Sequence, residues 1–90
     1  MARVLWTEPA RQDLEDIRSY IGRFSPLAAQ RMAVRLRAAA DSLREHPDRG
    51  RSIARGRREL TIIRPYLIRY RLDGEIVVIL RIRHGARRPG

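Results

Sequence analysis

The feature that most constrains this chain is the dipeptide Asp73-Gly74, which separates two strand-like runs, 66–72 and 75–82. Asp-Gly between β-branched and aromatic residues is the strongest short-range signal for a β-hairpin with a two-residue turn. Because the turn sets the register, it predicts these pairs: Leu72 with Glu75, Tyr70 with Val77, Ile68 with Ile79, and Tyr66 with Arg81.

This register sorts the side chains of the hairpin onto two faces. One face would carry Tyr66, Ile68, Tyr70, Val77, Ile79 and Arg81. The other would carry Leu67, Arg69, Arg71, Ile76, Val78, Leu80 and Ile82. Since both faces of the last strand would be apolar, both would need to be covered.

Two amphipathic segments precede the strands. Apolar residues recur at spacings of three and four over residues 10–24 and again over residues 29–43, which is typical of helices. Thr7 and Ser25 offer N-cap oxygens, and a proline stands in the first turn after each. The short link between the two segments predicts an antiparallel helical hairpin.

The order of these segments predicts an α+β fold. With a first strand at 3–6, a turn at 46–51 and a further strand at 59–64, the order is β-α-α-β-β-β in one domain, residues 1–90. The helical hairpin would pack on one face of a small, mainly antiparallel sheet. The other face would be open to a partner, unless the N-terminal segment or the stems of arginine side chains cover it.

Charge and composition limit the kinds of partner and cofactor that the chain is expected to bind. The chain has 90 residues and a net charge of +10, and all 20 basic residues are arginine. Such a surface attracts phosphates or an acidic protein. Without cysteine and with two distant histidines, neither a disulfide nor a metal site nor another cofactor is expected. No signal peptide or membrane-spanning run is recognisable, so we expect a soluble, cytoplasmic protein without a membrane partner.

A series of short motifs covers nearly the whole chain and, in this order, resembles the ParE branch of the RelE/ParE toxins. The motif residues are Trp6, Thr7, Ala10, Asp13 and Leu14; Ile17, Tyr20 and Ile21; Pro26, Ala28, Ala29 and Arg31; Leu43, Pro47, Gly50 and Arg51; Arg58 to Leu60; Pro65, Tyr66, Ile68 and Tyr70; and Ile79 to Arg87.

The resemblance implies the toxin of a bacterial type II toxin–antitoxin pair. Its partner would be an acidic antitoxin with a DNA-binding N-terminal part. ParE-like toxins inhibit DNA gyrase and so block replication, whereas RelE-like relatives cut mRNA in the ribosomal A site. The resemblance leaves open whether the toxin dimerises within the antitoxin complex.

The inventory of side chains favours gyrase inhibition over RNA cleavage. Cleavage by a 2′-hydroxyl needs a base, an acid and cations, and arginine supplies only the cations. RelE-like enzymes use lysines that this chain lacks, and the YoeB-like branch uses a His-Tyr pair where Gly85 follows His84 here. If the chain is a nuclease, its residues would be Glu59, Arg81, His84 and Arg87.

Two sets of binding residues follow from the resemblance and the open face. The gyrase-binding set is Arg81, Arg83, His84, Arg87 and Arg88. The antitoxin-binding set is Tyr66, Ile68, Tyr70, Arg69 and Arg71.

Other interpretations stay open. Glu59 would equally serve as the ion-pair partner of an arginine, and His84 as a hydrogen-bonded residue at a strand end. The arginine run 49–58 could bind nucleic acid directly, which the absence of interleaved aromatic residues disfavours. A degenerate toxin that only binds its antitoxin is the third functional interpretation.

Overall fold

The computed structural model describes residues 2–85, and its order of elements confirms the predicted α+β fold. The elements are β1 (Arg3–Trp6), α1 (Glu8–Gly22), α2 (Pro26–Asp41), the 3-10 turn η1 (Ser42–Arg44), β2 (Arg51–Ile53), the 3-10 turn η2 (Ala54–Gly56), β3 (Arg57–Ile63), β4 (Tyr66–Asp73) and β5 (Ile76–His84). β2 was not predicted, because three residues with no apolar alternation carry no strand signal. Within residues 2–85, no helix has the length and apolarity to span a membrane.

Both helices begin at the predicted caps. The Thr7 side chain accepts a hydrogen bond from the Ala10 amide, and the Ser25 side chain accepts one from the Ala28 amide. These bonds satisfy amides that have no partner inside the helix. α1 ends at Gly22, so Phe24 does not continue the predicted apolar stripe and is 74% exposed.

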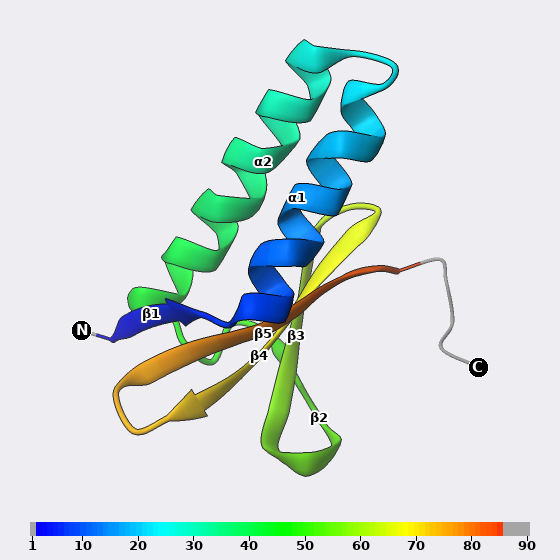
Figure 1. The fold of residues 1–90 in the computed structure, drawn as a ribbon. Coiled ribbons are helices and arrows are strands. Elements are labelled where there is room, and N and C mark those ends of the chain that lie inside the picture. The colour runs from blue at the N-terminus through cyan, green and yellow to red at the C-terminus, as the bar shows by residue number, and fades with distance from the viewer. Residues whose placement is uncertain (1, 86–90) are drawn as a thin grey trace.

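The strands form one mixed sheet in the order β1-β5-β4-β3-β2. β1 runs parallel to β5, and the other neighbours are antiparallel. Figure 1 shows α1 and α2 side by side on the same face of this sheet. Their apolar stripes bury the core against β3, β4 and β5.

The opposite face of the sheet, which we call the helix-distal face, is covered by no helix or strand of residues 2–85 (Figure 1). It carries Leu5, Arg57, Glu59, Leu67, Arg69, Arg71 and Val78. The N-terminal segment does not cover it, because β1 joins the edge of the sheet. Val78 is nevertheless only 5% exposed, and its cover by the stems of arginine side chains stays a prediction.

The predicted register of the β4–β5 hairpin is wrong. Gly74 and Glu75 form the turn, so Asp73 pairs with Ile76 and Tyr70 pairs with Ile79. Gly74 has φ +61°, and a glycine at the first turn position accepts this conformation without steric cost. The turn is thus one residue later than the Asp-Gly pattern indicated.

A β-bulge at Leu80 changes the register again. The pairing shifts between Tyr70–Ile79 and Arg69–Arg81, which leaves Leu80 as the extra residue of β5. An extra residue reverses the alternation of the side chains beyond it. Ile82 therefore points into the core and Arg81 lies opposite Arg69, so the predicted faces of Arg81 and Ile82 are corrected.

The segment predicted as a turn, residues 46–51, is held by Tyr70. The Tyr70 hydroxyl donates to the carbonyl oxygen of Pro47 at 2.7 Å and accepts from the amide of Gly50 at 2.8 Å. A Cβ atom at Gly50 would lie 2.7 Å from the Tyr70 ring, so only glycine allows this approach. The tyrosine thereby places β2 beside β3.

Candidate functional site

The outer edge of β5 is closed by side chains from the start of α1. β1 pairs with β5 only as far as Ile79. There the Thr7 hydroxyl donates to the carbonyl oxygen of Ile79 at 2.8 Å, and Asp13 Oδ2 accepts from the amide of Ile82 at 2.9 Å. These bonds satisfy edge groups that would otherwise be open to another strand.

Asp13 also holds Arg81. The Arg81 guanidinium donates from Nε to Oδ2 at 2.8 Å and from Nη2 to Oδ1 at 3.1 Å, a bidentate pair. The hydrogen bond and charge of Asp13 raise the pKa of Arg81 above its usual value. Arg81, predicted to contact the target, is thus committed to an intramolecular partner, although its side chain stays 43% exposed.

Sequence reasoning missed the role of Asp13. It stood in the motif that begins at Trp6, but nothing there indicated a partner 68 residues away. The bulge at Leu80 brings Arg81 and the amide of Ile82 to the same carboxylate, and a predicted register without the bulge could not find this.

His84 lies at the helix side of the sheet. It pairs with Tyr66 across β4 and β5, and the two rings meet edge to face with centroids 5.5 Å apart. Both line a cleft of about 340 Å³ between α1 and the end of β5. The other lining residues are Asp13, Asp16, Ile17, Tyr20 and Ile82.

Glu59 lies on the helix-distal face and is only 8% exposed. Its Oε2 accepts from Arg69 Nη2 at 2.6 Å and from Arg69 Nε at 3.0 Å. Arg51 Nη2 lies 3.6 Å from the other carboxylate oxygen. The interpretation of Glu59 as an ion-pair partner is confirmed.

The residues named for a nuclease are therefore not gathered at one place. Glu59 faces away from the helices, whereas His84 faces the cleft beside α1. Arg81 is paired with Asp13. Arg87, like the predicted target-binding Arg88, lies outside the described residues.

The predicted antitoxin-binding set is divided between the two faces. Tyr66, Ile68 and Tyr70 point under the helices and are 9%, 1% and 0% exposed. Arg69 and Arg71 alternate with them on the helix-distal face. Antitoxin binding stays a prediction for the two arginines, but Ile68 and Tyr70 have no surface to offer a partner.

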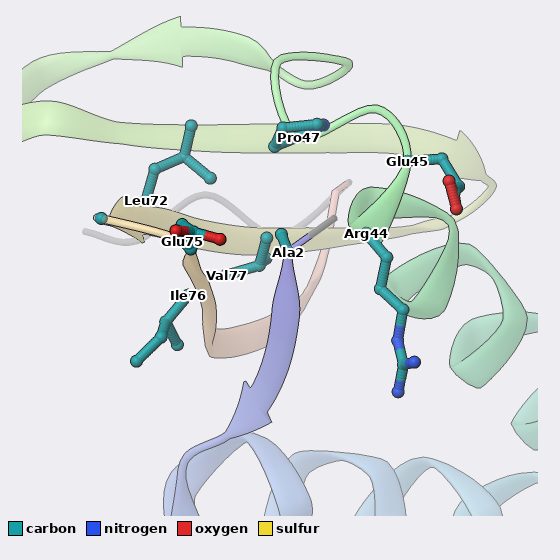
Figure 2. A pocket seen from close by; sticks show the side chains of 9 residues that line it. Ala2, Arg44, Glu45, Pro47, Leu72, Glu75, Ile76 and Val77 are labelled. Atoms are coloured by element: carbon teal, nitrogen blue, oxygen red, sulfur yellow. The ribbon is translucent and has the colours of Figure 1, made fainter.

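A second hollow, of about 540 Å³, lies at the opposite end of β5 (Figure 2). Its lining residues come from the start of β1, the end of the helical region and the β4–β5 turn: Ala2, Arg44, Glu45, Pro47, Leu72, Gly74, Glu75, Ile76 and Val77. None of the predicted site residues within the described part of the chain lines it. Within residues 2–85, no three His, Asp or Glu side chains are grouped to hold a metal ion.

Comparison with known protein families assigns the chain to one of them. Residues 4–89 match the family described as the ParE toxin of type II toxin–antitoxin systems, parDE. This chain belongs to the ParE toxin family.

Relatives and a solved structure are also parts of toxin systems, with RelE and ParDE names. Toxin RelE2 of Caulobacter vibrioides is 59% identical over 87 residues, which cover 97% of this chain and 99% of the relative. Toxin RelE1 of the same organism is 41% identical, with 91% of each chain covered. A chain of the chromosomal ParDE system of P. aeruginosa matches with a TM-score of 0.81 and 28% identity, over 93% of this chain and 96% of that chain. This ParE-family chain is thus a toxin of a type II toxin–antitoxin system.

Proposed function

We propose that this toxin inhibits DNA gyrase in the cytoplasm, without catalysing a reaction of its own, and so arrests growth by blocking replication. The observation that carries the proposal is the separation of Glu59 from His84 by the sheet. RNA cleavage needs a base and an acid on either side of one phosphate. Two titratable groups on opposite faces cannot serve one phosphate, whereas a binding inhibitor needs neither.

The gyrase-binding surface in this proposal is the charged end of the chain. Arg83 and His84 are partly exposed at the end of β5, and the predicted Arg87 and Arg88 follow in the sequence. Arg81 contributes through its exposed guanidinium face while Asp13 holds it in place. A cluster of basic residues suits an acidic or phosphate-bearing surface of a gyrase–DNA complex.

An acidic antitoxin is the second partner. Its segment would lie on the helix-distal face, where Arg69 and Arg71 are presented and no helix or strand of residues 2–85 intervenes. Charge complementarity with a +10 toxin favours such a partner. Its DNA-binding N-terminal part would remain free to reach an operator.

A supercoiling assay with purified gyrase and relaxed plasmid tests the proposal. Added toxin should reduce supercoiling and cause double-strand breaks that appear only when gyrase is present. Toxin mixed beforehand with its acidic antitoxin should have neither effect. Intact supercoiling with no gyrase-dependent breaks would refute gyrase inhibition.

A ribosome-dependent mRNA nuclease is the second candidate, because three relatives bear RelE names. A translation extract with a reporter mRNA separates the two activities. A nuclease would leave cuts in the ribosomal A site that disappear with His84→Ala and persist with Asp16→Ala, a matched change in the same cleft. We expect no cuts with the unmodified toxin.

Expression without an antitoxin distinguishes an active toxin from a degenerate one. An active toxin should arrest growth of the host cells. Normal growth at a verified level of folded protein would favour a module that only binds its antitoxin.

A further inference from the structure

Two arginines face each other on the helix-distal face without neutralisation. Arg57 of β3 lies directly opposite Arg71 of β4. Residues so paired have Cβ atoms about 4.5–5.5 Å apart, and like charges in this arrangement are destabilising. Such a pair needs an explanation.

The neighbouring arginine pair provides an internal comparison. Arg69 of β4 lies opposite Arg81 of β5, but Glu59 neutralises Arg69 and Asp13 neutralises Arg81. By contrast, no Asp or Glu of residues 2–85 forms an ion pair with Arg57 or Arg71. Among the described residues, the Arg57 side chain donates a hydrogen bond from Nε to the carbonyl oxygen of Ala54 at 3.1 Å.

The register extends this pair into a row across all five strands. The row runs Ile53, Arg57, Arg71, Val78 and Leu5, from β2 to β1. Its two ends are apolar, and Leu5 is 53% exposed. The row therefore presents two cations between aliphatic side chains.

We propose that Arg57 and Arg71 together bind one carboxylate of an acidic, partly apolar protein segment lying across the strands. This inference rests on the proposed function in that the segment belongs to the antitoxin. Besides the Arg57 Nε–H, which donates to Ala54, the two guanidinium groups offer nine N–H donors, and a carboxylate accepts from both while relieving their repulsion. The flanking aliphatic residues would contact the apolar side chains of the same segment.

The surface favours a protein segment over nucleic acid. Single-stranded nucleic acid binds where aromatic rings stack on bases between phosphate contacts. Tyr66 and Tyr70 point under the helices, and the row contains no aromatic residue. A segment with carboxylate and aliphatic side chains matches what the row offers.

A binding assay with poly-L-glutamate tests the carboxylate site without the antitoxin or gyrase. The variants are Arg57→Gln, Arg71→Gln and the double change, and the control is Arg35→Gln, which removes one exposed charge from α2. Fluorescence anisotropy at one fixed ionic strength gives the affinities. A single-stranded DNA oligonucleotide serves as the phosphate probe.

We expect each site variant to weaken poly-L-glutamate binding about tenfold and the control less than about threefold. Because both arginines hold the same carboxylate, the double variant should weaken binding by a factor far smaller than the product of the two single-variant factors. Arg71→Lys should lie between the unmodified protein and Arg71→Gln, since lysine keeps the charge but not the paired donors. Thermal unfolding should show all variants folded, with Arg57→Gln and Arg71→Gln at least as stable as the control, because each removes the repulsion between the two cations.

Two results would overturn the inference. Equal losses for site and control variants would mean that binding follows net charge alone. Loss of oligonucleotide binding with poly-L-glutamate binding retained would make the pair a phosphate site. A failure of the gyrase assay leaves this measurement valid, and a failure here leaves gyrase inhibition valid, so the two proposals fail separately.

Discussion

The two halves of β5 differ in what surrounds them, although they form one strand. Residues 76–79 lie between β1 and β4, and Val77 and Ile79 are 0% exposed. Residues 81–84 lie beyond the end of β1. There the Asp13 side chain, in place of a strand, accepts the hydrogen bond from the outer-edge amide of Ile82. The first half is core, and the second carries Arg81, Arg83 and His84.

The difference shows how a small basic toxin exposes charge without exposing an open strand. The bulge at Leu80 lets Ile82 stay in the core while its neighbours are charged. Asp13 satisfies the edge amide and neutralises one arginine at the same time. Arg81 and Ile82 are therefore held in a defined position by a side chain of α1.

Truncating a core side chain in the first half should have the largest effect. Ile79→Ala should lower the free energy of unfolding by about 2–5 kcal/mol, since Ile79 is fully buried and a cavity would remain. Arg83→Ala in the second half should change it by less than about 0.5 kcal/mol. Urea unfolding measures both, and equal losses would erase the distinction between the halves.

Removing the anchor of the second half should have the next largest effect. Asp13→Ala should cost about 1–3 kcal/mol, because the edge amide of Ile82 loses its acceptor and Arg81 its partner. Asp16→Ala is the matched control, since Asp16 is exposed and accepts one bond, from Gln12. If both changes cost the same in urea unfolding, the second half does not depend on Asp13.

The pH dependence of stability tests the first half of β5 through Tyr70, which lies opposite Ile79. Burial raises the pKa of Tyr70 above its usual 10.0, so the folded state favours the neutral phenol. That stabilisation is fully present below pH 10 and is lost as the pH rises through the folded-state pKa.

Tyr70→Phe should cost about 1–2 kcal/mol at neutral pH, because two hydrogen bonds are lost. Thermal unfolding from pH 8 to 11 should show a weaker pH dependence than in the unmodified protein. Tyr20→Phe, at an exposed position, is the control and should leave the profile unchanged. An unchanged profile for Tyr70→Phe would show that another group causes alkaline unfolding.

Shortening the chain should have the smallest effect on the fold. The chain should be cut after Gly85, because the Gly85 amide still donates to the carbonyl oxygen of Pro65 at 2.7 Å. A cut before Arg83 would remove two residues paired with β4 and the contact between His84 and Tyr66.

Deletion of residues 86–90 should change the unfolding free energy by less than about 0.5 kcal/mol. Under the proposed function it should also abolish growth arrest while antitoxin binding persists. Restoring the five residues in the same expression system is the control. A shortened toxin that still arrests growth would place the gyrase contacts in the folded part of the chain.

Local patterns predicted the helices, their caps and the order of the elements along the chain, apart from β2. The stripe from Ala10 to Ile21 and the caps at Thr7 and Ser25 act over one or two turns, so the sequence contains all of their information. The candidate site was predicted less well. The turn lies at Gly74-Glu75 instead of Asp73-Gly74, which changed every predicted pair of the hairpin, and the bulge at Leu80 then reversed the faces of Arg81 and Ile82.

The amino-acid pattern alone was enough to establish two amphipathic helices, an antiparallel hairpin, a strongly basic surface and a resemblance to ParE toxins. Those features depend on neighbours within a few residues or on composition. The pairing of Asp13 with Arg81, the seclusion of Glu59 beside Arg69 and the unneutralised pair Arg57–Arg71 emerged only in the folded chain. Each of these three arrangements brings together residues of different helices or strands, and tertiary packing sets how those elements are aligned. Contacts between residues so far apart leave no periodic pattern in the sequence.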